Sequence, residues 1–192
     1  MRRRTFDGLM ATAGLVLAAV LLVAGGLLTW AHTFVSDQVR EQLVAQKIFF
    51  PPAGDAIADP AIKPYLTQYA GQQLTTGPQA KAYADHFIAV HIKEMSGDRS
   101  YSELSAASRA APNDTELAGL VNTVFKGETL RGLLLNAYAF DTMARIALYA
   151  SFASFIGAAA MFALAMLGFA HRRRTDPAAA LGIHRTPVPA TV

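Results

Sequence analysis

Two long apolar runs dominate the pattern of hydrophobic and polar positions along the chain. No Asp, Glu, Lys or Arg occurs from Gly8 to Ser36, and none occurs from Ile146 to Ala170. Each run is longer than the roughly 20 residues that a helix needs to cross a hydrocarbon core of about 30 Å. The pattern therefore predicts two transmembrane helices, at residues 9–31 and 146–170.

A cleaved signal peptide is the alternative for the first run, because Arg3-Arg4-Thr5-Phe6 resembles the start of a twin-arginine export signal. The run is much longer than the roughly 7 to 15 apolar residues of a signal peptide. In addition, no convincing small-x-small cleavage site precedes the polar residues that follow Trp30. We therefore expect the first helix to remain as an anchor.

Between the two runs, helical patterns recur and strand patterns do not. Beyond the first run, Phe34, Val39, Leu43 and Ile48 fall near helical spacing, and neither Gly nor Pro occurs before Pro51. We therefore expect the first membrane helix to continue unbroken to about Ile48 as a stalk.

The stretch Phe49-Phe50-Pro51-Pro52 follows this stalk. Pro51 disfavours helical geometry at Phe50 and so ends the helix. The stalk would carry the phenylalanines roughly 28 Å beyond the first run, and a returning helix at residues 128–145 would span about 27 Å. We therefore expect two matched stalks, with Phe49 and Phe50 packed at the far end of the outer domain. A partner surface formed by Phe49 and Phe50 is the alternative.

Capping signals divide the rest of the outer segment into further helices. They are Thr76 or Gly77 before a helix that ends at Gly97, Ser100 with Glu103 for a shorter helix, and Asn113 with Glu116 before a helix that ends at Gly127. The first of these helices has one apolar stripe, formed by Ala80, Tyr83, Ala84, Phe87, Ile88, His91 and Met95.

These elements predict an all-α fold, in which two transmembrane helices extend as stalks into an extracytoplasmic helical bundle of four-helix type. The predicted parts are a cytoplasmic N-terminal tail (1–8), the first transmembrane helix (9–31), the extracytoplasmic helical domain (32–145), the second transmembrane helix (146–170) and a disordered cytoplasmic tail (171–192). The last part is rich in Pro and Ala and has no apolar stripe.

Clusters of arginine predict the orientation. Arginines 2–4 precede the first run and arginines 172–174 follow the second, and such clusters stay on the cytoplasmic side. The prediction is a plasma-membrane protein with both termini cytoplasmic and residues 32–145 extracytoplasmic. That middle segment carries ten Lys and Arg against twelve Asp and Glu, so the net charge of +3 comes from the tails and does not indicate nucleic-acid binding.

Candidate chemistry is sparse. The chain has no cysteine, which excludes disulfides and thiolate metal sites, and it has no nucleotide-binding, serine-hydrolase or HExxH motif. Asp85, His86, His91 and Glu94 come closest to a metal site. Residues five apart on a helix, however, are turned by about 140° from each other, so His86 and His91 cannot hold one ion together. We expect a core position for His91, no catalytic residue and no cofactor.

Small residues recur in both apolar runs. At four-residue spacing they let two helices approach closely in lipid, either within one chain or with a partner. The alternative is that abundant Ala and Gly produce this spacing by chance. The candidate packing residues are Gly14, Ala18, Gly25, Ala150, Ser154, Gly157 and Ala158.

The runs YAGQQLTTGPQAKAYADHFI, YSELSAASRAAP and FKGETLRGLLLNAYAF resemble a family of uncharacterised two-span membrane proteins of Actinobacteria, some of which carry a ring-opening dioxygenase label. The resemblance covers roughly residues 2–174 and is one of sequence texture and topology. It implies a plasma-membrane location and leaves the function open. The dioxygenase label finds no support in the residues, because a non-haem iron site needs two His and a carboxylate together.

Two functions fit these predictions. In the first, the chain is a non-catalytic accessory or scaffolding subunit of a membrane complex, in contact with the lipid bilayer and with another membrane protein or itself. In the second, it is an extracytoplasmic sensor-like module that binds a ligand, since chemoreceptors and sensor kinases begin with the same layout. Sensors continue into a signalling domain after their second span, whereas about twenty residues follow here. We therefore prefer the accessory role.

Overall fold

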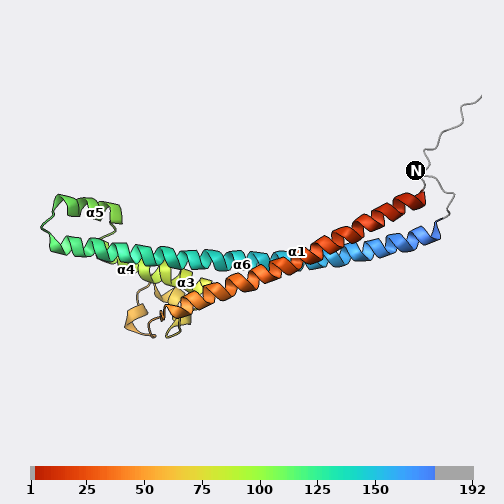
Figure 1. Ribbon diagram of the computed structural model, residues 1–192. Coiled ribbons are helices and arrows are strands. Elements are labelled where there is room, and N and C mark those ends of the chain that lie inside the picture. Colours follow the sequence, from red (N-terminus) through yellow and green to blue (C-terminus); the bar gives the residue numbers. More distant parts are fainter. Residues whose placement is uncertain (1–2, 176–192) are drawn as a thin grey trace, which may run out of the picture. The chain divides into compact units, whose positions relative to one another are not determined.

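The computed structural model describes residues 3–175, and 83% of them are helical (Figure 1). The described part is all-α, as predicted, and its single β-bridge joins Phe49 to Gln73. The elements in chain order are α1 (Arg3–Ala45), η1 (Asp55–Ile57), α2 (Lys63–Leu66), η2 (Thr67–Tyr69), α3 (Gly77–Tyr83), η3 (Ala84–Ile88), α4 (Ala89–Ser96), α5 (Tyr101–Ala110) and α6 (Thr115–Arg174).

The chain divides into two compact units. Unit 1 takes in Met1–Trp30 and Leu148–Val192, of which residues 3–30 and 148–175 are described, and unit 2 is Ala31–Ala147. Helices α1 and α6 contribute residues to both units. The predicted boundaries at residues 31/32 and 145/146 fall close to this division, while the side of a membrane assigned to each part stays a prediction.

Helix α1 ends at Ala45, earlier than the predicted end near Ile48. Lys47 has a φ of 53°, in the left-handed region, which does not continue an α-helix. Beyond it the backbone is extended, and the Phe50 amide donates to the carbonyl of Gln72 at 2.9 Å. The helix ends early because a distant segment supplies these backbone partners.

The two phenylalanines that follow α1 have different surroundings. Successive side chains of an extended backbone point to opposite sides. Phe50 is buried, with its ring centroid 5.1 Å from that of Tyr69 and 5.3 Å from that of Tyr83. Phe49 is 56% exposed. Phe50 is therefore packed, as predicted, whereas Phe49 is not. The alternative, a partner surface formed by Phe49 and Phe50, stays a prediction.

The two long helices of unit 2 also differ in length. The ring Nδ1 of His32 donates to the carbonyl of Ala144 at 2.9 Å, which places these two residues at one level. From this level, α1 continues for thirteen residues and ends at Ala45. Helix α6 begins twenty-nine residues before the same level, at Thr115. The stalks are not matched, since α6 begins well before residue 128. The far end of unit 2 is formed by α5 and the first turns of α6, and not by the phenylalanines (Figure 1).

Helices α3, η3 and α4 follow one another without a break. The hydroxyl of Thr76 accepts from the amide of Gln79, and the side chain of Gln79 accepts in return from the amide of Thr76. Gly97 ends the helix with a φ of 61°, a conformation that glycine adopts without strain. Both predicted helix ends are confirmed.

The middle of this helix, η3, is π-helical, which the sequence pattern did not predict. Side chains four residues apart on an α-helix drift around it by about 40° per step. A π-helical turn takes up an extra residue and so reduces this drift. Residues at four-residue spacing therefore stay on one face of the helix. Met95, which was predicted to lie on the apolar stripe, falls outside this spacing and is 50% exposed. The buried residues at this spacing are Ala80, Ala84, Ile88, Ile92 and Ser96.

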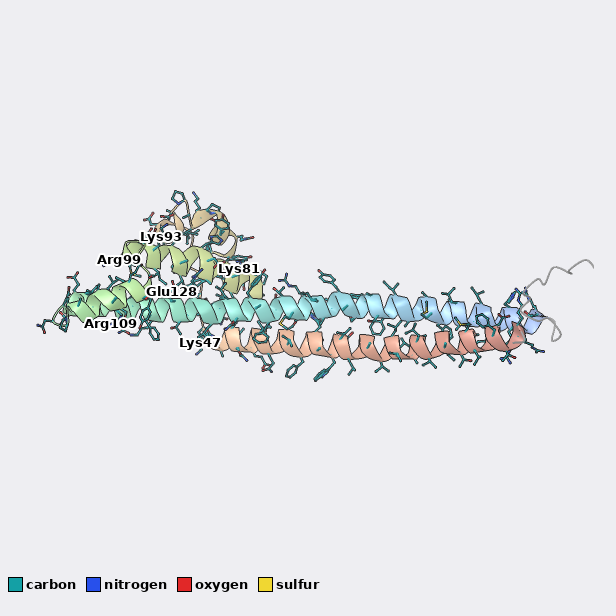
Figure 2. All side chains as sticks on the ribbon, turned by 90° about the horizontal axis from the view of Figure 1, so that it is seen from above. Lys47, Lys81, Lys93, Arg99, Arg109 and Glu128 are labelled. Carbon is teal, nitrogen blue, oxygen red and sulfur yellow. The ribbon has the colours of Figure 1, made fainter. Side chains whose placement is uncertain are left out.

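Two glycines let α3 and α4 lie close against α6 (Figure 2). A Cβ added at Gly127 would lie 2.7 Å from the Cδ1 of Ile92, and one added at Gly77 would lie 2.7 Å from the Cγ of Asp141. Gly127 was predicted to end a helix, but it lies inside α6, where the missing side chain makes room for α4.

Helix α5 begins with the predicted capping box, in which the Ser100 hydroxyl accepts from the amide of Glu103 and the Glu103 carboxylate accepts from the amide of Ser100. The cap of α6 differs from the prediction. The carboxylate of Asp114, rather than the side chain of Asn113, accepts from the amide of Leu117 at 2.9 Å. The acidic side chain at this position also suits the positive end of the helix dipole.

Unit 2 is not a bundle of four-helix type. The ring of Tyr101 in α5 lies 5.5 Å from that of Phe125, beyond the level at which α1 ends. The core beside α1 is instead closed by the segment between α1 and α3. Buried core residues from that segment are Phe50, Ile57, Ile62, Leu66 and Leu74, and those from α1 are Val39 and Leu43.

The end of α6 corrects one further boundary. The predicted disordered tail began at residue 171, but residues 171–174 are the last residues of α6. Residues 176–192, which make up the rest of the predicted tail, lie outside the described part of the chain.

We predict that Gly77→Ala lowers the free energy of unfolding by about 1 to 3 kcal/mol, because its Cβ would overlap the side chain of Asp141. The matched control is Gly132→Ala, a helical position with no atom within 4 Å, which should stabilise the protein by about 0.5 to 1 kcal/mol through helix propensity. Thermal unfolding of the full chain in detergent micelles measures both. Equal effects of the two substitutions would contradict the close approach of α3 to α6.

Candidate functional site

In unit 1, α1 and α6 pack along a seam of small residues. Buried positions recur at seven-residue intervals in each helix, the spacing typical of left-handed coiled-coil packing. In α1 the buried positions at this interval are Ala11, Ala18 and Gly25, beside Gly8, which is also buried, and in α6 they are Ser151, Ala158 and Ala165.

Glycines mark the closest approaches in this seam. A Cβ added at Gly25 would lie 2.8 Å from the Cε1 of Phe155, and one added at Gly157 would lie 3.3 Å from the Cδ1 of Leu21. The glycines thus give room to large side chains of the opposite helix. Without an aqueous driving force, such close packing is a main source of helix association in lipid.

All seven predicted packing residues are buried or half-buried: Ala18, Gly25 and Ala158 are buried, and Gly14, Ala150, Ser154 and Gly157 are half-buried. The search for small residues at four-residue spacing selected Ala150, but its neighbour Ser151 is the residue that is buried. It also missed Ala165. The signal that finds them is the seven-residue spacing of small residues. Contact of these residues with another protein stays a prediction.

The outward faces of unit 1 carry large apolar side chains. Both α1 and α6 are long enough and apolar enough to cross a membrane, and only 17% and 11% of their most apolar windows are buried. Side chains that are more than half exposed include Leu9, Met10, Val16, Val20, Val23 and Leu27 in α1, and Phe152, Ile156, Phe162, Leu164 and Leu167 in α6.

A groove of about 380 Å³ lies between α1 and α6 in unit 2. Its lining is mostly apolar and includes Phe34 and Phe140. The apolar lining residues are Val35, Val39, Leu43, Leu133 and Ala137, and the polar ones are Gln38, Gln42, Gln46 and Asn136. Every polar side chain in the groove is thus a carboxamide, which both donates and accepts hydrogen bonds. The sequence analysis did not find this groove, because it depends on how α1 and α6 face each other.

A cluster of charged residues lies where η3 meets α6. The carboxylate of Asp85 forms ion pairs with Lys81 and with the Nη2 of Arg131, the latter at 3.5 Å. The Nη1 of Arg131 lies 3.3 Å from the carboxylate of Glu128, and the Nζ of Lys81 lies 5.5 Å from the ring centre of Tyr138. Figure 2 labels Lys81 and Glu128, which come from the neighbouring elements α3 and α6. The cluster connects the π-helical turn to α6.

Burial alone would raise the pKa of the Asp85 carboxyl, but the hydrogen bond and charge of Lys81, together with the charge of Arg131, hold that pKa below its ordinary value. The ionised carboxylate is therefore part of the folded state at neutral pH. One atom of the cluster remains unsatisfied, since the buried Nε of Arg131 has no hydrogen-bond partner among the described residues.

The two histidines of the sequence DHFIAVHIKE have separate contacts. The ring of His86 stacks on that of Tyr65 at 3.4 Å, and the Nδ1 of His91 donates to the carbonyl of Phe87 at 2.7 Å. The described residues contain no group of three His, Cys, Asp or Glu placed to hold a metal ion. The helix is π-helical here, so the ideal 140° rotation between residues five apart does not apply. The observed contacts, rather than that angle, separate the two rings.

Comparison with known proteins adds nothing to this geometry, since no family model, no curated protein and no solved structure matches the chain. The resemblance to the two-span family of Actinobacteria therefore stays a prediction.

We predict that Asp85→Asn destabilises the protein at neutral pH by up to about 1 kcal/mol, since it removes the carboxylate from two ion pairs. A carboxyl whose pKa is lower in the folded state stabilises the fold above its unfolded pKa of about 4, and this contribution disappears as the pH falls through the folded pKa. The difference from the wild type should therefore shrink between about pH 5 and pH 3. Thermal unfolding in micelles across this range measures it.

The control for this experiment is Asp37→Asn. Asp37 is exposed on α1 and makes no ion pair with any described residue, so its substitution should change stability little at any pH. A deficit for Asp85→Asn that stays constant from neutral to acid pH would contradict the role given to the carboxylate.

Proposed function

We propose that the chain is an integral protein of the plasma membrane, and that it serves as a non-catalytic accessory or scaffolding subunit of a larger membrane complex. In this proposal α1 and α6 cross the bilayer at about residues 9–31 and 146–170. Both termini are cytoplasmic, and residues 32–145 are extracytoplasmic. Lipid and at least one other membrane protein are its partners.

The observation that carries the membrane part of the proposal is the exposure of the two apolar helices. Burying one large apolar side chain is worth about 1.5 to 3 kcal/mol, so leaving many such side chains in water would be very unfavourable. The apolar windows of α1 and α6 are only 17% and 11% buried, whereas the core helix of a globular protein is mostly buried. A lipid environment accounts for this exposure.

The seam of unit 1 supports retention of the first helix over cleavage as a signal peptide. Ala11, Ala18 and Gly25 are buried within unit 1, against the second apolar helix. Removal of the first helix would therefore uncover the opposing small residues of α6. The arginines at positions 2–4 and 172–174 support the orientation with both termini in the cytoplasm.

The proposed accessory role is supported by where exposed apolar groups occur in unit 2. The small residues of the seam are buried or half-buried between α1 and α6, so they are poorly placed to receive another protein. Outside the groove, unit 2 exposes Met143 and Ile146, which lie three residues apart on α6, and it also exposes Phe49 after the end of α1. Apolar groups at a protein surface mark sites of protein contact when they lie together.

A sensor-like module is the second candidate, and the groove is the observation that favours it. A volume of about 380 Å³ is within the range of small-molecule sites, and such sites combine an apolar lining with a few polar groups. A ligand-dependent rise in the unfolding temperature of the full chain would favour sensing over scaffolding.

The membrane topology can be tested with reporter fusions. We predict that the chain remains in the membrane pellet after alkaline extraction, and that alkaline phosphatase fused after Val192 is inactive, because that end is cytoplasmic. A fusion after Gly54, in the loop that follows α1, should be active. An active fusion after Val192 would overturn the orientation, and release by alkaline extraction would overturn membrane integration.

The accessory role can be tested by purification of the tagged full chain from native membranes in mild detergent. We predict that a different membrane protein is recovered with it in a fixed ratio. An unrelated two-span protein with the same tag controls for non-specific recovery. Recovery of this chain as a monomer or homodimer alone would refute the accessory role.

A further inference from the structure

One face of the α1 and α6 pair in unit 2 is not covered by the rest of the described chain. Helices α3 and α4 pack on the face of α6 that contains Gly127 and Asp141. The groove lies on a different face of α6, which contains Leu133, Asn136 and Phe140. Leu133 and Phe140 are each more than half exposed, so this face presents apolar surface without a partner from its own chain.

The lining of the groove carries no formal charge. This is unusual for unit 2, since residues 31–147 include ten Lys and Arg and twelve Asp and Glu. The polar groups of the groove are the carboxamides of Gln38, Gln42, Gln46 and Asn136. Within the described residues these four side chains make no hydrogen bond. Gln38, Gln42 and Gln46 follow one another at four-residue spacing, the first two in α1 and the third directly after its end at Ala45.

We propose that this groove binds a second copy of the chain, groove against groove, around a two-fold axis. A carboxamide can donate to and accept from another carboxamide, so the same surface presented twice can pair with itself. A purely apolar partner would bury these carboxamides without hydrogen bonds, which is unfavourable. A highly charged partner would find no opposite charge. Two pairs of α1 and α6 complete a four-helix arrangement that one chain lacks.

The direction of pairing follows from the chain ends. Unit 2 begins at Ala31 and ends at Ala147, and the hydrogen bond from His32 to Ala144 shows that both ends lie together. Two copies anchored in one membrane therefore pair with these ends on the same side, and α1 of one copy faces α6 of the other. This step, unlike the choice of partner, rests on the membrane anchoring proposed above.

The same hydrogen bond sets the level at which side chains meet. Counted from it, Asn136 lies eight residues along α6, while Gln38 and Gln42 lie six and ten residues along α1. Asn136 of one copy should therefore lie between Gln38 and Gln42 of the other copy.

Disulfide formation tests this pairing directly, because the natural chain has no cysteine. Two differently tagged full-length chains are co-expressed, one with Gln42→Cys or Gln38→Cys and the other with Asn136→Cys. A disulfide requires Cα atoms within roughly 7 Å of each other. We expect mild oxidation of the membranes to give a species that carries both tags, and reduction to abolish it.

The matched control is Arg40→Cys with Asn136→Cys. Arg40 is exposed and lies between the two glutamines in sequence, but it is turned by about 160° from each of them. It should give at least about tenfold less of the two-tag species, since its Cα faces away from the second copy. Thermal unfolding of each variant, all of which change exposed residues, confirms that the fold is kept.

Three results would overturn the proposal. Equal cross-linking at Arg40 would show that the disulfides come from random collision. Cysteines at positions 38 and 42 that react freely with a maleimide and do not cross-link would show an open groove. Cysteines that are protected from maleimide and do not cross-link would show that a different molecule occupies it.

The cross-linking test of the pairing can succeed or fail independently of the tests of the proposed function. If alkaline extraction releases the chain from the membrane, the same cysteine pairs are oxidised in the released protein, and a two-tag species still supports pairing of the grooves. If the chain is recovered only as a homodimer, the accessory role fails while the pairing proposed here is supported.

Discussion

The close approach of α3 and α4 to α6 is the constraint on which unit 2 depends. It is possible because Gly127 and Gly77 have no side chains at the two points where Ile92 and Asp141 occupy the space. Once this face of α6 is covered, α1 packs on a different face of the helix. The core then forms between α1, α6 and the segment after α1, and the groove between α1 and α6 is left open at the surface.

The π-helical turn extends this contact along the helix. A regular α-helix would turn its buried residues away from α6 after a few steps of four residues. With the extra residue of η3, buried positions continue from Ala80 to Ser96. The same turn positions Asp85 beside Arg131, so the covered face of α6 holds charged groups that are matched with each other. Charge is thus satisfied on the covered face, while the open groove is neutral.

In unit 1 the same two helices, α1 and α6, pack against each other in a different way. Its contact consists of small residues, and the large apolar side chains point outward. In water this arrangement would be inverted, because burial of large apolar groups is the main stabilising term. In lipid the outward groups are already in an apolar solvent, and the helices gain mostly from close packing. The distribution of side-chain size in unit 1 therefore fits the lipid environment proposed for it.

Patterns among residues that are close together in the sequence were sufficient to predict some elements and insufficient for others. The apolar runs, the helix start at Thr76 or Gly77, the capping box of Ser100 with Glu103 and the stop at Gly97 were predicted, because each depends on residues within a few positions of one another. The small residues of the two runs were also recognised, although their seven-residue spacing was not.

Tertiary structure alone decided the features that depend on distant residues. Gly127 reads as a helix stop in the sequence, and only the approach of Ile92 explains why it lies inside a continuous α6. Phe49 and Phe50 look equivalent until Gln72 pairs with the Phe50 backbone and sends the two rings to opposite sides. The groove, likewise, consists of residues about one hundred positions apart, which no local pattern could bring together. The sequence by itself determined which segments are helical and apolar, and long-range packing decided where they end and which faces stay open.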